Sequence, residues 1–174
     1  ESLEQARSEK GSMSSKNLFY IIEKETEVLP IKTAVLTAIH NNAATYLNPP
    51  IKNLTYKGIY KASDEIIRWF DTSKSIEEDF KMTAMLMEKA GTGGAIFRNL
   101  YRDFLKEAFD LTKNDNIKVA YLTFVEIAKN WDEVIALFKK VSDTKNRNYI
   151  LEASKKMKDI SVQEKEAMQI LENV

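Results

Sequence analysis

The segment from Ile117 to Val141 most constrains the fold, because apolar side chains recur along it at helical spacing without an interrupting Gly or Pro. Its apolar face comprises Ala120, Phe124, Ile127, Ala128, Trp131, Ile135 and Phe138. A long helix with one apolar face has to bury that face against other elements. The 174 residues include only five Gly and three Pro, which disfavours extensive disorder or a many-turned β-sandwich. We therefore expect a mainly α-helical domain.

The same periodicity predicts further helices on both sides of this segment. They are expected over 30–47, 56–70, 75–90, 95–111 and from 147 to near the C-terminus. Ser75 and Glu78 form a capping-box pattern at the start of one helix, and Ser161 with Glu164 forms a second that would restart the last helix. Together they predict a compact core of about six helices over residues 30–174. Phe104 is expected in that core, where its replacement by Ala would cost roughly 3–5 kcal/mol.

Residues 1–29 read as an N-terminal arm in front of the helical core. Within it, residues 17–23 hold a short apolar stretch rich in β-branched and aromatic side chains, which favours a strand. A lone strand needs a partner, so the stretch is either an irregular extended arm or a strand completed by another part of the protein. Because the chain begins with Glu1 rather than Met, we expect residues 1–174 to be one domain at the C-terminal end of a larger two-domain protein.

Charge and composition exclude several classes of function. Lys and Arg total 26, as do Asp and Glu, so no net field favours nucleic acid or an anionic membrane as a partner. No apolar run reaches the roughly 18 residues that span a bilayer. The chain has no Cys, and its only histidine, His40, cannot anchor the usual zinc sites. We expect a soluble, cytoplasmic chain with no cofactor, no metal and no catalytic residue of its own.

The Gly91–Gly94 turn and Arg98 form the most informative motif. Glycines can present backbone amides to an anion at a helix N-terminus, and an arginine one turn later adds a charged fork. Gly93, Gly94 and Arg98 are therefore our candidate ligand-binding residues. The structural alternative is a helix C-cap at Gly91, an N-cap at Thr92 and close packing of small residues.

The run GTGGAIFRNLYRDFLKEA, from Gly91 to Ala108, resembles the signature of the C-terminal domain of unknown function of butirosin biosynthesis protein H-like proteins. The resemblance extends to the segments 6–11 and 16–20, the Leu47, Pro49 and Pro50 helix end, and Trp69. It implies a two-part protein of antibiotic biosynthesis, whose N-terminal part has a cysteine-protease-type fold with the reactive Cys. Such a protein moves an acyl group from a carrier protein onto an aminoglycoside amine.

Two main hypotheses follow for this chain, and a third, a ligand-sensing regulatory domain, would require a buried pocket. In the first it is an accessory helical domain that shapes the substrate cleft of a cysteine-dependent acyltransferase. Its partners would then be the cysteine-containing N-terminal domain and an acyl carrier protein. In the second it is a helical protein-interaction or dimerisation module, whose homodimer forms through the helices over 117–141 and 147–171.

Overall fold

The computed structural model describes residues 2–8, 10–11, 14, 18–23, 28–89 and 94–174. Its helices are α1 (Ser2–Ser8), α2 (Ile31–Leu47), α3 (Thr55–Thr72), α4 (Ile76–Lys89), α5 (Ala95–Thr112), α6 (Asp115–Thr144) and α7 (Arg147–Leu171). The described residues contain no β-strand. None of the helices in the described ranges is both long enough and apolar enough to cross a membrane. The prediction of a mainly α-helical domain is confirmed.

Helices α6 and α7 form the scaffold of the molecule. Asn114 caps α6 by accepting hydrogen bonds from the backbone N–H groups of Asn116 and Ile117, and Asn146 caps α7 by accepting one from Asn148. Between them, Lys145 adopts the left-handed conformation, with φ of 54°, that ends α6 and lets the chain reverse. The two longest helices thus form a tight hairpin around which the other helices gather.

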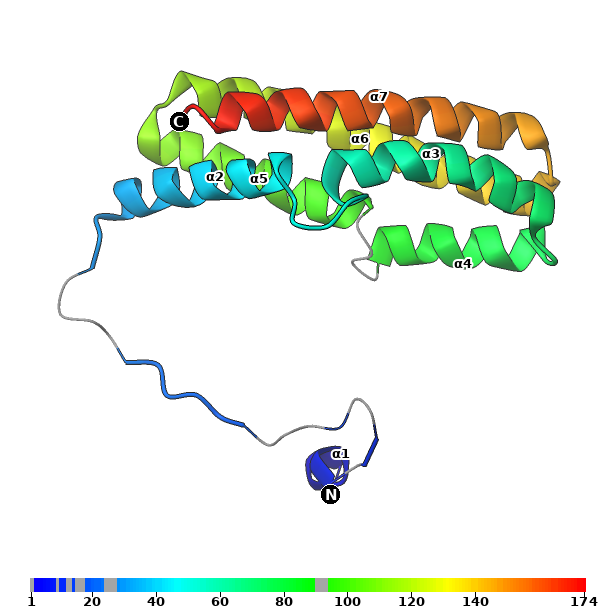
Figure 1. Ribbon diagram of the computed structural model, residues 1–174, viewed down its shortest axis with the longest axis horizontal. Coiled ribbons are helices and arrows are strands. Elements are labelled where there is room, and N and C mark those ends of the chain that lie inside the picture. Colours follow the sequence, from blue (N-terminus) through cyan, green and yellow to red (C-terminus); the bar gives the residue numbers. More distant parts are fainter. Residues whose placement is uncertain (1, 9, 12–13, 15–17, 24–27, 90–93) are drawn as a thin grey trace.

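Each scaffold helix carries two shorter helices. α2 and α3 pack along α7, whereas α5 and α4 pack along α6 (Figure 1). Aromatic rings join the two sets at one end: Trp69 of α3 stacks on Phe80 of α4 at a centroid distance of 4.5 Å. Phe80 is fully buried and meets Phe138 of α6 edge-on at 5.5 Å. These contacts fix the α3–α4 hairpin on the scaffold.

The two capping-box patterns have different outcomes. Ser75 Oγ lies 3.2 Å from Glu78 Oε2, and α4 begins at Ile76 as predicted. The restart at Ser161 is wrong, because α7 runs unbroken through it. Ser161 is buried and its hydroxyl donates to the backbone carbonyl of Tyr56 at 2.8 Å, so the same pattern serves a contact with α3.

Gly58 lies inside α3, where glycine ordinarily costs roughly 1 kcal/mol relative to alanine. The structure explains why it stands there. A Cβ at this position would lie 2.4 Å from the backbone carbonyl oxygen of Asn53, closer than the two atoms can approach. Glycine is needed because the loop before α3 folds back onto the first turn of the helix. The φ angles are positive at Asn53 in this loop, 70°, and at Thr55, the first residue of α3, 59°.

The strand predicted over 17–23 does not form in the described part of this segment. Asn17 lies outside the described residues, and residues 18–23 are neither helix nor strand. Phe19 is 81% exposed and Ile22 is 96% exposed, and Figure 1 draws the segment apart from the bundle. The physical reason is the missing neighbour: no described strand offers a ladder with which this backbone could pair.

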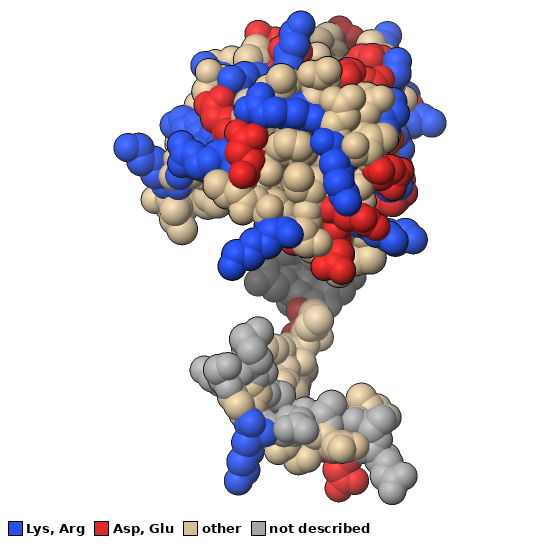
Figure 2. All heavy atoms as spheres, turned by 90° about the vertical axis from the view of Figure 1, so that its right-hand side faces the viewer, with Lys and Arg blue, Asp and Glu red and all other residues tan. Residues whose placement is uncertain are grey.

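Charges of both signs alternate over the end of the bundle that faces the viewer in Figure 2. Lys145 pairs with Glu77, and Arg147 pairs with Asp71. This face therefore presents a mixed surface rather than a field of one sign, in line with the equal totals of acidic and basic residues.

Candidate functional site

A buried ion pair lies where α2, α5, α6 and α7 meet. The guanidinium of Arg98 in α5 binds the carboxylate of Glu164 in α7 through two hydrogen bonds, of 2.8 Å from Nε and 3.1 Å from Nη2. The Arg98 side chain is 15% exposed and that of Glu164 is 1% exposed. A carboxylate so deeply buried is stable only where donors satisfy its oxygens.

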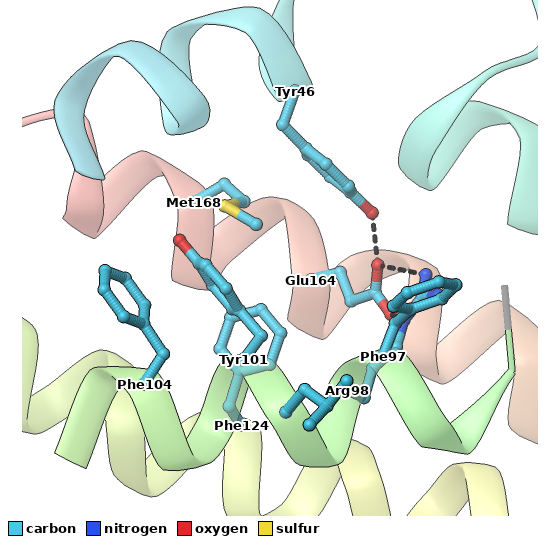
Figure 3. Close-up of a pocket in the computed structure, with 9 residues that line it drawn as sticks. Tyr46, Phe97, Arg98, Tyr101, Phe104, Phe124, Glu164 and Met168 are labelled. Atoms are coloured by element: carbon cyan, nitrogen blue, oxygen red, sulfur yellow. Dashed lines mark hydrogen bonds and ion pairs between the residues drawn. The ribbon is translucent and has the colours of Figure 1, made fainter. Parts of the chain in front are cut away.

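Two further side chains complete the surroundings of Glu164. The phenol of Tyr46 in α2 donates to Glu164 Oε2, and the indole Nε1–H of Trp131 in α6 donates to Oε1 at 3.1 Å. The Arg98 guanidinium also lies over the Trp131 ring, 5.2 Å from its centroid. Four helices are thus tied together through one carboxylate, and part of this cluster is visible in Figure 3.

Electrostatics keep Tyr46 and Arg98 each in one protonation state at neutral pH. Burial raises the pKa of Tyr46 far above its usual range, and the nearby Glu164 carboxylate raises it further. Burial on its own lowers the pKa of Arg98, but the Glu164 carboxylate outweighs that effect and the pKa is raised. A neutral phenol and a permanently charged guanidinium are donors, so the cluster supports structure rather than proton transfer.

An apolar groove opens beside the cluster, with a volume of about 490 Å³. Its lining residues are Tyr46, Phe97, Arg98, Leu100, Tyr101, Phe104, Phe124, Glu164 and Met168. The Tyr46, Arg98 and Glu164 side chains form its polar end, with the Phe97 ring beside them, and the Tyr101, Phe104 and Phe124 rings with Met168 form the other end (Figure 3). Both the volume and the balance of apolar walls with few polar groups are typical of sites for small ligands.

Tyr101 supplies the one unsatisfied polar atom in the groove's described lining. Its hydroxyl oxygen is buried and has no hydrogen-bond partner among the described residues. Burial raises the pKa of Tyr101, so the group is a neutral donor. The ring is held edge-on against Phe124 at 4.8 Å, and Figure 3 places the hydroxyl on the Met168 side of the groove. Because an unpaired buried hydroxyl is costly, a ligand acceptor here would be stabilised.

The apolar stripe predicted for α5 divides into two parts. Leu105 and Ala108 are buried in the core as expected. Phe97 is 51% exposed, Leu100 59% and Phe104 37%. The expectation that Phe104 is a core residue is therefore wrong, because α5 packs mainly on α6 and the rest of its stripe forms the groove wall.

The candidate ligand residues of the glycine turn are placed as follows. Gly93 lies outside the described residues. Gly94 is buried, and a Cβ on it would lie 2.7 Å from both the Cβ and the carbonyl oxygen of Met87, so it permits close approach of α5 to α4. Arg98 lines the groove with its guanidinium bound to Glu164. Anion binding by these residues stays a prediction, while the geometry gives Gly94 and Arg98 packing and pairing roles.

Sequence reasoning missed the other members of the site. Glu164 belongs to a predicted capping box, and Tyr46 lies in the last turn of the helix predicted over 30–47. The only signal for Glu164 was its position one turn after Ser161 on the buried face of α7.

His40, considered for metal binding, donates from Nδ1 to the backbone carbonyl of Glu172 at 2.7 Å. The described ranges contain no group of three His, Cys, Asp or Glu side chains that could hold a metal ion.

Comparison with known proteins identifies the family without an activity. No curated protein and no solved structure matches this chain. The model of a family described as a domain of unknown function, DUF4872, matches residues 1–171. Since that match spans nearly the whole sequence, the chain belongs to the DUF4872 family.

Proposed function

We propose that this domain is an accessory substrate-binding unit, which holds the apolar acyl part of a substrate in the groove of α2, α5 and α7. The observation that carries the proposal is the buried hydroxyl of Tyr101, which has no hydrogen-bond partner among the described residues and lies in the apolar part of the groove wall. A hydroxyl in that setting favours a ligand with one acceptor next to an apolar body. An acyl group, with its carbonyl oxygen and its hydrocarbon chain, has that chemistry.

The groove binds and orients, and the chemistry takes place elsewhere. Arg98 and Glu164 neutralise each other, and Tyr46 is held as a donor to Glu164, so none of the three is poised to move a proton. Tyr101 would donate to the acyl carbonyl, while Leu100 and Phe104 would cover the chain. The cluster acts by positioning the groove walls.

The resemblance to butirosin biosynthesis protein H-like proteins supplies the wider setting of this proposal. In that setting the parent is a cytoplasmic, cysteine-dependent acyltransferase of antibiotic biosynthesis. An acyl carrier protein presents the acyl thioester, and a cysteine-containing N-terminal domain takes the acyl group. The helical domain contributes one wall of the cleft in which the acyl chain lies during transfer to the amine.

Calorimetric titration of the 174-residue chain with S-octanoyl-pantetheine tests the proposal directly. We expect saturable binding that unacylated pantetheine does not show. Tyr101→Phe should weaken it about five- to tenfold through loss of one hydrogen bond. Leu100→Lys and Phe104→Lys should abolish it, because each places a charge in the apolar wall.

Met82→Lys is the matched control, since Met82 is 54% exposed and lies on α4 away from the groove. It should leave the affinity unchanged. Equal binding of pantetheine and its octanoyl thioester would reject the proposal, as would an affinity that Leu100→Lys does not alter.

Self-association is the second candidate function, and the exposed row of Phe97, Leu100 and Phe104 on α5 favours it. The helices that the sequence suggests for a homodimer, over 117–141 and 147–171, use many of their apolar side chains to pack against each other and against shorter helices, so the α5 row is the stronger candidate surface. Sedimentation equilibrium separates the candidates. A dimer that Leu100→Lys converts to monomer would support association, and a monomer at every concentration would reject it.

A further inference from the structure

A second cavity lies between α3 and α4, on the other side of Arg98 from the groove. Its volume is about 600 Å³. α3 rests on α7 and α4 rests on α6, so the two helices form opposite walls. The stacked rings of Trp69 and Phe80 join the walls at the hairpin end, where α3 is followed closely by α4. We refer to this cavity as the α3–α4 cleft.

The lining of the cleft is mainly apolar, with Asn53, Thr55 and Thr83 as its uncharged polar residues. Its apolar walls include Ile59 and Ala62 of α3, Leu86 of α4 and Phe138 of α6. Arg98 is the one charged residue in the described lining, and Glu164 already neutralises it. An ionic ligand would lose its hydration without gaining a counter-charge, so the cleft favours a neutral one.

Thr55 lines the same cleft and has two unusual properties. Its Oγ1 is buried without a hydrogen-bond partner among the described residues. Its φ of 59° is rare and strained for a β-branched residue. The loop before it lies close over the first turn of α3, where a Cβ at Gly58 would meet the Asn53 carbonyl. The fold thus holds an unsatisfied hydroxyl at an apolar cavity, at a local cost in stability.

We propose that the α3–α4 cleft is a second ligand site, which takes a neutral small molecule with an unbranched apolar chain and one hydrogen-bonding head group. The chain lies between Ile59 and Leu86, and the head group meets Thr55 Oγ1. The volume is within the range of about 300–1,000 Å³ that small-molecule sites occupy. Apart from Arg98, the described linings of this site and of the groove share no residue, so the two sites can be tested separately.

Tryptophan fluorescence reports on the cleft directly, because both tryptophans of the chain, Trp69 and Trp131, line it. The probe is octanamide, an uncharged eight-carbon amide, and acetamide is the control for the head group alone. We expect octanamide to change the emission saturably and acetamide to leave it unchanged. Trp69→Phe should remove much of the response, which assigns the signal to the α3 wall.

Variants of the cleft decide the assignment. Thr55→Val keeps the shape of the side chain and removes its hydroxyl, and it should weaken octanamide binding about five- to tenfold. Ala62→Phe should abolish binding by filling the space. Circular dichroism checks that each variant is folded, and Thr55→Val carries the test if the larger side chain prevents folding.

Octanamide also suits the groove, and Leu100→Lys removes any binding there, so this variant should leave the Trp69-dependent part of the response unchanged. Three outcomes would overturn the assignment: no saturable response to octanamide, an affinity that Thr55→Val leaves the same, or a response that Leu100→Lys removes. The last outcome would place the ligand in the groove and leave the proposed function intact.

Discussion

Two arginine–carboxylate pairs of almost the same geometry occur in very different surroundings. Arg98 binds Glu164 through contacts of 2.8 and 3.1 Å, and Arg147 binds Asp71 through two contacts of 3.0 Å. The first pair has side chains that are 15% and 1% exposed, and the second has side chains that are 47% and 48% exposed. The two pairs therefore have nearly the same hydrogen-bond distances and differ in how deeply their side chains are buried.

The difference shows that contact distances alone do not measure the importance of an ion pair. Water and salt already solvate Arg147 and Asp71, so breaking their contact exposes each group to a good alternative partner. Glu164 has no access to water, and its alternative is a buried charge with fewer donors. The same contact is therefore marginal at the surface and structural in the interior.

Glu164→Ala should give the largest effect. Removal of the carboxylate leaves the Arg98 guanidinium, the Tyr46 hydroxyl and the Trp131 indole without their shared acceptor. We expect the free energy of unfolding to fall by roughly 3–5 kcal/mol, as measured by urea denaturation. Glu166→Ala, on the exposed face of the same helix, is the control and should have little effect. Equal losses for the two variants would contradict the comparison.

A pair of double-mutant cycles sharpens the contrast. Combining Arg98→Ala with Glu164→Ala should be less damaging than the sum of the single changes, by up to about 3 kcal/mol. The same cycle on Arg147 and Asp71 should give a coupling too small to separate from measurement error. Equal coupling in the two cycles would show that geometry, rather than burial, sets the strength of these pairs.

Tyr46→Phe should have a smaller effect, of about 1.5–2 kcal/mol, because it removes one hydrogen bond to a charged acceptor. It should also change the response to alkali. The pKa of Tyr46 is raised in the folded state, so its contribution is fully present below the unfolded value of 10.0 and is lost as the pH rises above it. The urea midpoint should therefore fall less between pH 8 and pH 10.5 in the variant than in the original chain. An equal alkaline decline in both would mean that the phenol does not stabilise the fold as a neutral donor.

Asp71→Asn should give the smallest effect. The hydrogen bond from Arg147 lowers the pKa of Asp71, so any stabilisation is present above the unfolded pKa of the carboxyl and is lost as the pH falls. Because the pair is exposed, we expect the variant and the original chain to have the same melting temperature at neutral pH. Screening of this pair by 1 M salt should likewise leave the melting temperature of the original chain unchanged. A clear loss of melting temperature on substitution would show that this surface pair has a structural role.

Helix positions were predictable from sequence because their signals are local. The helix expected over 56–70 is observed over Thr55–Thr72, and that expected over 95–111 is observed over Ala95–Thr112. Apolar periodicity, prolines and caps act within one helix, so the residues that carry them are neighbours in sequence. The direction in which a face points depends on other helices, and this is where the expectation for Phe104 failed.

The site was less predictable because its contacts join distant parts of the chain. Sequence alone singles out Arg98 as a candidate ligand residue, but its partner lies 66 positions away, and Tyr46 is 118 positions from the same carboxylate. A Ser-x-x-Glu pattern looks the same whether it caps a helix or places a carboxylate in the core. Gly58 shows the same limit, since only the folded loop reveals the Asn53 carbonyl above it.

The end of α7 is held from two sides, which has a consequence for local opening. The Nδ1–H of His40 donates to the backbone carbonyl of Glu172. The side-chain amide of Asn116 donates to the backbone carbonyl of Asn173 at 3.1 Å. Terminal turns ordinarily fray within a folded protein and exchange their amide hydrogens fast. Here α2 and α6 bind the carbonyls of the two residues that follow α7, so its last turn should show slow amide exchange like an interior segment.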